Sequence, residues 1–197
     1  MEFEEVLRSR QSTRKYLPKQ ISDEQLQTLL ETANRAPVGS KLYKDIHLTV
    51  VQNQEILLKL CEAAWERFSS RQKVEEIAGE TLDKTQTKEI RINLFYDAPT
   101  VIFVSHRRQT LQPGIEWANA TSVVNEMHLA ATDMGLGSVY MWGALESMRM
   151  IPELDHTELL ELPEGFEPLI ALAVGYPAEE LRERPVSHEM ITTNYIR

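Results

Sequence analysis

The chain has 197 residues, of which 42% are hydrophobic and 26% charged, with a formal net charge of −9 and a single cysteine. These values are typical of one globular domain, and they exclude a chain that is disordered over most of its length. The acidic balance argues against a nucleic-acid or anionic-membrane partner. Because Cys61 is the single cysteine of the sequence, the chain cannot form an intramolecular disulfide. With no signal-peptide pattern and no membrane-spanning window, we expect a cytoplasmic protein.

A basic run near the start of the chain opposes the overall sign of its charge. Five cationic side chains and no acidic one lie between Arg8 and Lys19. The centre of this run, Ser9-Arg10-Gln11-Ser12-Thr13-Arg14, follows a short helix predicted over residues 2–10. Arginines on both sides of a serine offer forked donors and a hydroxyl, which are the groups that bind a phosphate monoester. Charge runs are more often solvated surfaces, so from these residues alone a solvent-exposed surface is the favoured interpretation.

The next predicted element is a helix with a clear N-terminal signal. Ser22 and Gln25 form a capping box, and leucines follow at helical spacing. The stretch Ala36-Pro37-Val38-Gly39-Ser40 ends this helix, because proline disfavours helix in the preceding residue and glycine permits a tight backbone path.

Four stretches rich in apolar and β-branched residues predict buried strands: residues 46–51, 100–105, 137–142 and 169–174. His106-Arg107-Arg108 is expected to end the second of them. The longest helix is predicted over residues 115–134, and its apolar side chains cover several sides, so it belongs inside the core or is shared with a second subunit. Strands that do not alternate simply with single helices favour an α+β layer fold.

Two segments are expected to lie outside the main body of this single domain, which spans residues 1–197. Residues 66–93 are mostly polar and predict a peripheral helical insertion. An inert surface excursion is favoured there over a mobile cover of a site. Residues 185–197 form a C-terminal arm whose apolar side chains need a surface to cover, in this chain or on a neighbour.

Motifs that would place catalytic chemistry on side chains are absent from the sequence. The five histidines have no metal-ligand spacing, so no metal site is expected. There is no nucleophile elbow and no P-loop, and Gly135-Leu136-Gly137 follows a helix instead of opening one. If the protein is an enzyme, a cofactor is therefore expected to carry the reaction.

Several of these stretches occur in the order and spacing of one family. The chain resembles the flavin-dependent nitroreductases over nearly its whole length. The resemblance is carried by five segments: Ser9 to Arg14, Ala36 to Gly39, Ala98-Pro99, the helix end Leu129-Ala130-Ala131 with Gly135-Leu136-Gly137-Ser138, and Ala173-Val174-Gly175-Tyr176-Pro177.

This resemblance implies an α+β homodimer with a mostly antiparallel central sheet and FMN at the subunit interface. NADH or NADPH would reduce the FMN, and an electron-poor small molecule such as a nitroaromatic or quinone would reoxidise it. No catalytic side chain is implied, because the hydride chemistry takes place on FMN.

The resemblance also implies which residues bind the cofactor. Arg10, Ser12 and Arg14 would hold the FMN phosphate and ribityl or the pyrimidine edge, with a backbone contact from Gln11. The implied set from the rest of the chain is Pro37, Val38 and Gly39 from the other subunit, Tyr140, Met141, Trp142 and Gly143 along the ring, and Arg182 and Arg184 at the phosphate.

The chain departs from the family pattern in one place. Many members carry Pro-Ser-x-x-Asn-x-Gln-Pro-Trp after the first capped helix, but residues 37–45 lack the asparagine, the glutamine and the tryptophan. This loss motivates an alternative, a flavin-binding carrier or sensor without reductase turnover. Among enzymes, the sequence leaves open nitroreduction, dehalogenation and fragmentation of the flavin.

Overall fold

A four-stranded antiparallel sheet forms the centre of the protein. The computed structural model describes residues 1–61, 93–149, 156–182 and 191–197. The strands are β1 (Ile46–Val51), β2 (Thr100–Arg107), β3 (Gly137–Met141) and β4 (Phe166–Gly175). Their order in the sheet is β1-β2-β4-β3, and each neighbouring pair is antiparallel. The last strand in sequence therefore lies inside the sheet, and β3 is an outer strand.

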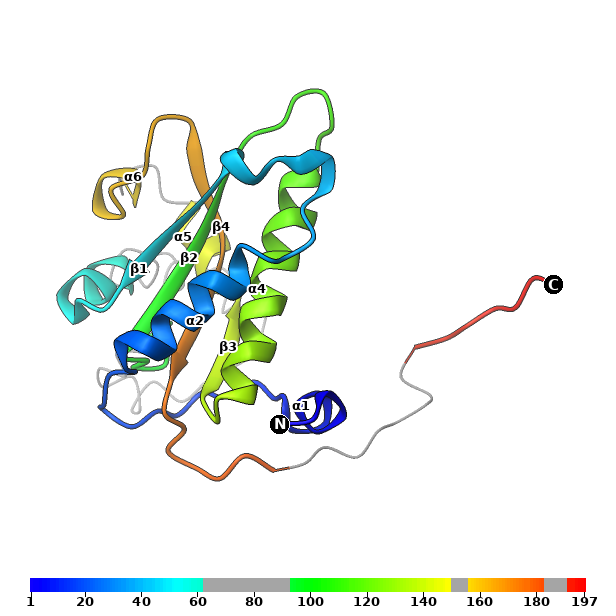
Figure 1. The fold of residues 1–197 in the computed structure, drawn as a ribbon. Helices are drawn as coiled ribbons and strands as arrows, with labels where there is room; N and C mark the ends of the chain where they lie inside the picture. Colours follow the sequence, from blue (N-terminus) through cyan, green and yellow to red (C-terminus); the bar gives the residue numbers. More distant parts are fainter. Residues whose placement is uncertain (62–92, 150–155, 183–190) are drawn as a thin grey trace, which may run out of the picture.

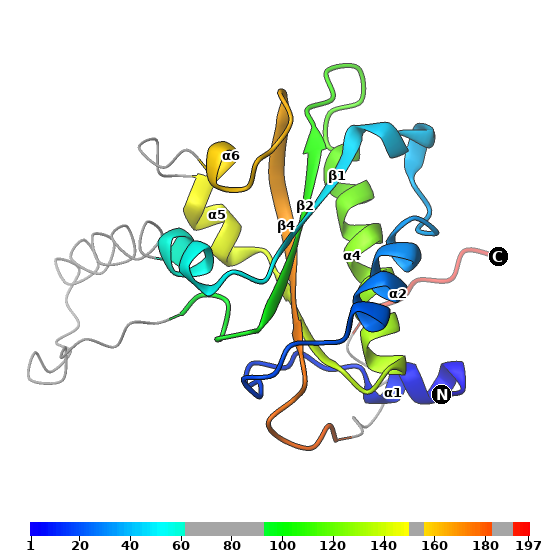
Figure 2. The ribbon, with the colours of Figure 1, turned by 60° about the vertical axis from the view of Figure 1, so that its left-hand side comes forward.

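Helices cover both faces of this sheet (Figures 1 and 2). The elements are α1 (Phe3–Ser9), α2 (Asp23–Ala33), the short 3-10 turns η1 (Gly39–Lys41) and η2 (Tyr43–Asp45), α4 (Ile115–Asp133), α5 (Gly143–Arg149) and α6 (His156–Leu159). A further helical stretch covers residues 54–61. Helices α2 and α4 pack on one face, and residues 54–61, α5 and α6 lie on the other.

The alternation of side chains along the strands divides the core into two clusters. Val101, Phe103 and Ala171 face the layer that contains Leu57 and Leu145. On the other face, β2 and β4 pack against α4, and α2 packs on α4 within the same cluster, whose buried side chains include Ile102, Leu172, Leu29, Val123 and Met127. Burial on both faces explains why β2 and β4 are almost continuously apolar. Cys61 is buried in the first cluster, as expected for a core residue.

The helix starts and strand positions expected from the sequence are largely confirmed. Ser22 caps α2, and both hydrogen bonds of its capping box with Gln25 are present. Two strand ends differ, because β2 continues to Arg107 and β4 begins at Phe166. Arg107 pairs with Phe166 in the ladder, and its guanidinium lies 4.8 Å from the ring centroid. This cross-strand contact extends both strands beyond the apolar cores of their sequences.

The two segments expected outside the main body are only partly described. All of the 66–93 insertion except Asn93 lies outside the described residues, as do residues 185–190 of the arm. The described end of the arm exposes Ile191, Tyr195 and Ile196. Within the described residues, no helix has the length and apolarity to cross a membrane.

Candidate cofactor site

Residues 10–17 form a strap across the end of the sheet where β3 begins and β4 ends. Ser12 makes a parallel bridge to Ser138, and the Thr13 N–H donates to the Ser138 carbonyl at 2.9 Å. Further along, the Leu17 N–H donates to the Tyr176 carbonyl at 2.9 Å. Backbone hydrogen bonds at both ends of the strap thus fix the path of the basic segment.

The close approach of the strap to β3 depends on a glycine. A Cβ atom placed on Gly137 would lie 2.6 Å from Cγ2 of Thr13 and 2.8 Å from its Oγ1. Only a residue without a side chain allows the strap to lie this near the strand.

The cations of the basic run, Arg8 to Lys19, differ in their partners. Arg8 forms an ion pair with Glu4, and Lys15 Nζ lies 2.6 Å from Glu179 Oε1. Within the described part of the chain, neither Arg10 nor Arg14 has a carboxylate within ion-pair distance. These two arginines keep their charge and most of their donors for another anion. This donor set fits a phosphate group.

The guanidinium of Arg10 contacts a buried histidine. Its Nη1 lies 3.1 Å from Nε2 of His128, whose Nδ1 lies 2.5 Å from the Ser138 hydroxyl. Since arginine only donates, Nε2 accepts and the imidazole proton lies on Nδ1. Burial, and then the nearby Arg10 charge, lower the pKa of His128 to about 4. His128 is therefore neutral at neutral pH.

Arg14 lies further along the strap, and the C-terminal segment that contains Arg182 lies against the start of the strap. The Arg14 guanidinium is 5.8 Å from the ring centroid of Tyr96. The side chain of Gln11 donates to the Arg182 carbonyl at 3.1 Å, which brings the C-terminal segment beside the basic run. Arg184 lies outside the described residues. Of the two arginines predicted to complete the phosphate site, Arg182 and Arg184, the structure thus places the backbone of Arg182 beside the strap.

Of the predicted ring-side residues, Tyr140 and Met141 follow Ser138 on β3, and Trp142 and Gly143 lie where the chain passes into α5. Tyr140 is two residues beyond Ser138, a separation of roughly 7 Å along a strand, and its hydroxyl donates to Thr121 Oγ1 at 3.0 Å. Met141 is buried, whereas Trp142 is 52% exposed. A Cβ added to Gly143, the first residue of α5, would meet no atom of the described residues within 4 Å.

The loop Pro37 to Gly39 lies elsewhere in the same chain. The Gly39 N–H donates to Oδ1 of Asn119 at 2.8 Å, and Asn119 Nδ2 lies 3.3 Å from Nε2 of His106. Asn119 and His128 are nine residues apart on α4, about 14 Å at 1.5 Å per residue. The structure therefore does not bring the loop and the strap together within one chain, and they lie toward opposite ends of α4 (Figure 1).

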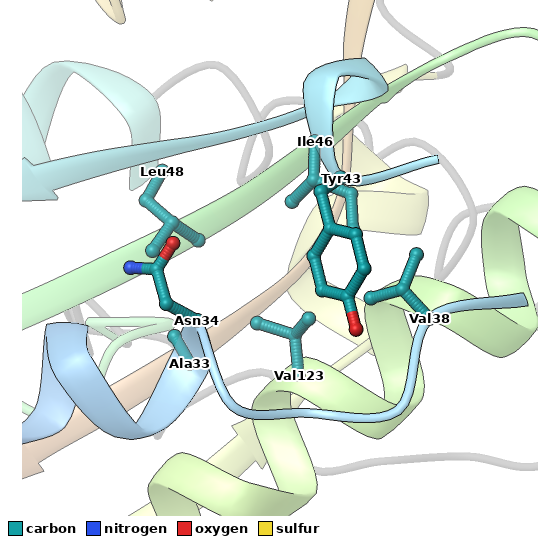
Figure 3. Close-up of a pocket in the computed structure, with 7 residues that line it drawn as sticks. All are labelled: Ala33, Asn34, Val38, Tyr43, Ile46, Leu48 and Val123. Carbon is teal, nitrogen blue, oxygen red and sulfur yellow. The ribbon is translucent and has the colours of Figure 1, made fainter. Parts of the chain in front are cut away.

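A small pocket lies under this loop. Figure 3 shows its lining side chains converging between the end of α2 and α4: Ala33, Asn34, Val38, Tyr43, Ile46, Leu48 and Val123. Its volume is about 60 Å³, well below the several hundred Å³ of typical cofactor pockets. The pocket cannot hold a flavin.

Two polar residues of the site, His128 and Asn119, were not singled out from the sequence, and Ser138 was quoted only within the segment Gly135 to Ser138. His128 and Asn119 are buried in α4, with 4% and 2% of their surface exposed, and Ser138 is 1% exposed. One sequence signal could have identified the two residues of α4: each is a polar residue within an apolar helical stripe. A polar side chain that is buried in this way needs a hydrogen-bond partner. Within the described residues, no three His, Cys, Asp or Glu side chains gather as a metal site would require.

The chain is an α+β protein with an antiparallel sheet, and a strap that carries Arg10 and Arg14 crosses the start of its outer strand β3. Residues 7–176 match the Nitroreductase family, and the chain belongs to that family. A solved structure of a nitroreductase with bound FMN from Bacteroides fragilis has a TM-score of 0.76 and 27% identity, and the match covers 99% of this chain and 100% of that one.

Two curated relatives are each 26% identical to the chain. One is an NADPH-dependent oxidoreductase from Staphylococcus haemolyticus, with 92% of this chain and 67% of the relative covered. The other is an NADPH-flavin oxidoreductase from Vibrio harveyi, with 96% and 72% covered. The resemblance recognised in the sequence is thus confirmed.

Proposed function

We propose that this protein is an FMN-dependent NAD(P)H oxidoreductase, acting as a homodimer, that reduces an electron-poor small molecule such as a nitroaromatic or quinone. The observation that carries this proposal is the pair Arg10 and Arg14, which have no carboxylate partner among the described residues in a chain of this family. The FMN of the Bacteroides fragilis structure and the NADPH use of the curated relatives support it.

The residues of the strap would hold the polar end of the cofactor. Arg10, beside the segment of Arg182, would bind the phosphate together with Arg184, and Ser12 would add a hydroxyl donor. Arg14 lies further along the strap and would bind the ribityl or the pyrimidine edge. Charge-assisted hydrogen bonds of this kind contribute about 1.5 to 3 kcal/mol each.

The end of β3 would hold the ring. Bound FMN supplies the atom that accepts hydride from NAD(P)H and passes it to the acceptor. The backbone of the segment Tyr140 to Gly143 would lie along the ring and donate to it. The protein then needs no side-chain base. It binds the ring, leaves one face accessible and admits the two substrates in turn.

A second copy of the chain would complete the site. The loop Pro37 to Gly39 is fixed near the opposite end of α4 from the strap, so the partner's loop is the one proposed to reach the ring. Ala118, Thr121 and Asn125 are exposed at helical spacing on α4; Thr121 and Asn125 lie between the contact points Asn119 and His128, and Ala118 lies directly before Asn119. This face and the exposed Trp142 offer a surface for pairing.

The proposal is tested by titrating the purified protein with FMN and then following NADH or NADPH oxidation with a nitroaromatic or a quinone. We expect a yellow complex and acceptor-dependent oxidation. A colourless protein that takes up no FMN would contradict the proposal. FMN binding without NAD(P)H oxidation would instead favour a flavin carrier or sensor.

A further inference from the structure

We propose that His128 is a positioning residue that aims the Arg10 guanidinium at the cofactor phosphate while leaving the charge of Arg10 uncompensated. The inference rests on the proposed FMN site. It assigns a role to a residue of the buried side of α4 that has no direct contact with the proposed cofactor.

The contacts of His128 hold it in one orientation and one tautomer. Its Nδ1–H donates to the Ser138 hydroxyl at 2.5 Å, and its Nε2 faces Arg10 Nη1 at 3.1 Å. The carbonyl of Ser138 is in turn held by the Thr13 N–H at 2.9 Å. Ser138 of β3 thus holds both the strap, through its carbonyl, and the imidazole of His128, through its hydroxyl. The position of Arg10 and the position of its acceptor therefore depend on the same strand.

A neutral acceptor suits this task better than a carboxylate. Arginine has five N–H donors in a rigid fork, and His128 engages one nitrogen of it, which leaves the others for an anion. A carboxylate in place of the imidazole would also orient the Arg10 guanidinium, but it would neutralise the positive charge of Arg10. Two other cations of the basic run do pair with carboxylates, Arg8 with Glu4 and Lys15 with Glu179.

The buried position of His128 keeps the imidazole neutral. It is 4% exposed, and the charged group that faces it from the strap is Arg10 itself. A second imidazole proton would face the donors of Arg10 and remove the acceptor, so burial and the Arg10 charge both disfavour it.

The test compares the affinities of His128 variants for FMN and for riboflavin, which lacks the phosphate. We expect His128→Leu to weaken FMN binding about tenfold, the typical effect of one charge-assisted hydrogen bond, and to leave riboflavin binding within about twofold. His128→Gln should retain most of the FMN affinity, because its amide oxygen can accept from Arg10. His47→Leu is a matched control, since His47 packs on Phe166 at the distant edge strand β1.

A double-mutant cycle separates positioning from a structural effect. In an Arg10→Ala background, His128→Leu should cause no further loss of FMN affinity, because its effect passes through Arg10. Equal losses for FMN and riboflavin, or full additivity with Arg10→Ala, would overturn the inference. If His128→Leu does not fold, the His128→Gln variant replaces it in the test. A large loss of FMN affinity in His128→Gln, with riboflavin affinity unchanged and the same loss in the Arg10→Ala background, would overturn the inference. A wild-type protein that binds no FMN would instead defeat the proposed function on which the inference rests.

Discussion

The backbone N–H of Gly39 donates a 2.8 Å hydrogen bond to the side-chain oxygen of Asn119, a residue of α4 with 2% of its surface exposed. This contact fixes the loop after α2 on the long central helix, and the same side chain reaches His106 at the end of β2. A single buried amide therefore joins loop, helix and sheet.

Replacing Asn119 with leucine should loosen the loop and lower stability. The substitution keeps the volume but leaves the Gly39 N–H without its acceptor, which costs about 1 to 3 kcal/mol of unfolding free energy for a buried group. Urea unfolding measures the loss. Gln27→Leu, at an exposed position of α2, should change the unfolding free energy by no more than about 0.5 kcal/mol. Equal losses in both variants would show that the Asn119 contact is not the cause.

Gly137→Ala should displace the strap. The new methyl group would lie 2.6 Å from Thr13 Cγ2, and the Thr13 backbone is tied to Ser138, so one of the two segments must move. We expect a loss of about 1 to 3 kcal/mol in unfolding free energy, typical of overpacking, together with weaker FMN binding. Thr13→Ala in the same protein removes two of the three clashing atoms and should restore part of the thermal stability. An unchanged melting temperature for Gly137→Ala alone would refute the close approach.

The depressed pKa of His128 predicts a pH dependence of stability. Its pKa is about 4 in the folded protein and about 6.5 in the unfolded chain. Between these values the unfolded chain binds a proton that the folded protein does not, so the unfolding free energy falls as the pH falls through this window. The loss from this residue is about 2 kcal/mol between about pH 7 and about pH 5. Denaturant unfolding at the two pH values should show a smaller drop for His128→Leu than for the wild type, and equal drops would contradict the assignment.

The cations of the basic run should separate into two groups by their effect on FMN. Arg10→Ala and Arg14→Ala should each weaken FMN binding about tenfold or more, since each removes a charge-assisted contact of about 1.5 to 3 kcal/mol. Arg8→Ala and Lys15→Ala should change the FMN affinity by no more than about twofold, because these side chains form exposed ion pairs with Glu4 and Glu179. Fluorescence titration of FMN checks all four variants. Unchanged FMN affinity for Arg10→Ala and Arg14→Ala would mean that the phosphate and the ring bind elsewhere.

Local chemistry made much of the fold predictable. The Ser22–Gln25 capping box places the start of α2, and the β-branched runs place the strands to within a few residues. The strand ends at Arg107 and Phe166 were missed because they depend on a cross-strand contact between residues far apart in sequence. The insertion of β4 between β2 and β3 is likewise a property of the whole sheet.

The candidate site was predictable only in its parts. The basic segment and the glycines carry local signals in the sequence. The family resemblance then indicated that these separate segments belong to one site. His128 lies 118 residues from Arg10 in sequence, and Asn119 lies 80 residues from Gly39, so neither pairing has a local pattern. A lone polar residue in an apolar helix indicates that a partner exists, but only the fold identifies it.

The composite nature of the site is tested most directly by a heterodimer of two defective chains. One chain carries Arg10→Ala in the strap, and the other carries Asn119→Leu behind the loop; the two are co-expressed with different affinity tags and purified as a pair. If strap and loop come from different subunits, one of the two sites in the heterodimer contains both intact parts. We predict that each variant homodimer binds FMN weakly and that the heterodimer regains one site of wild-type affinity. A heterodimer with no tight FMN site would contradict a site built from two subunits.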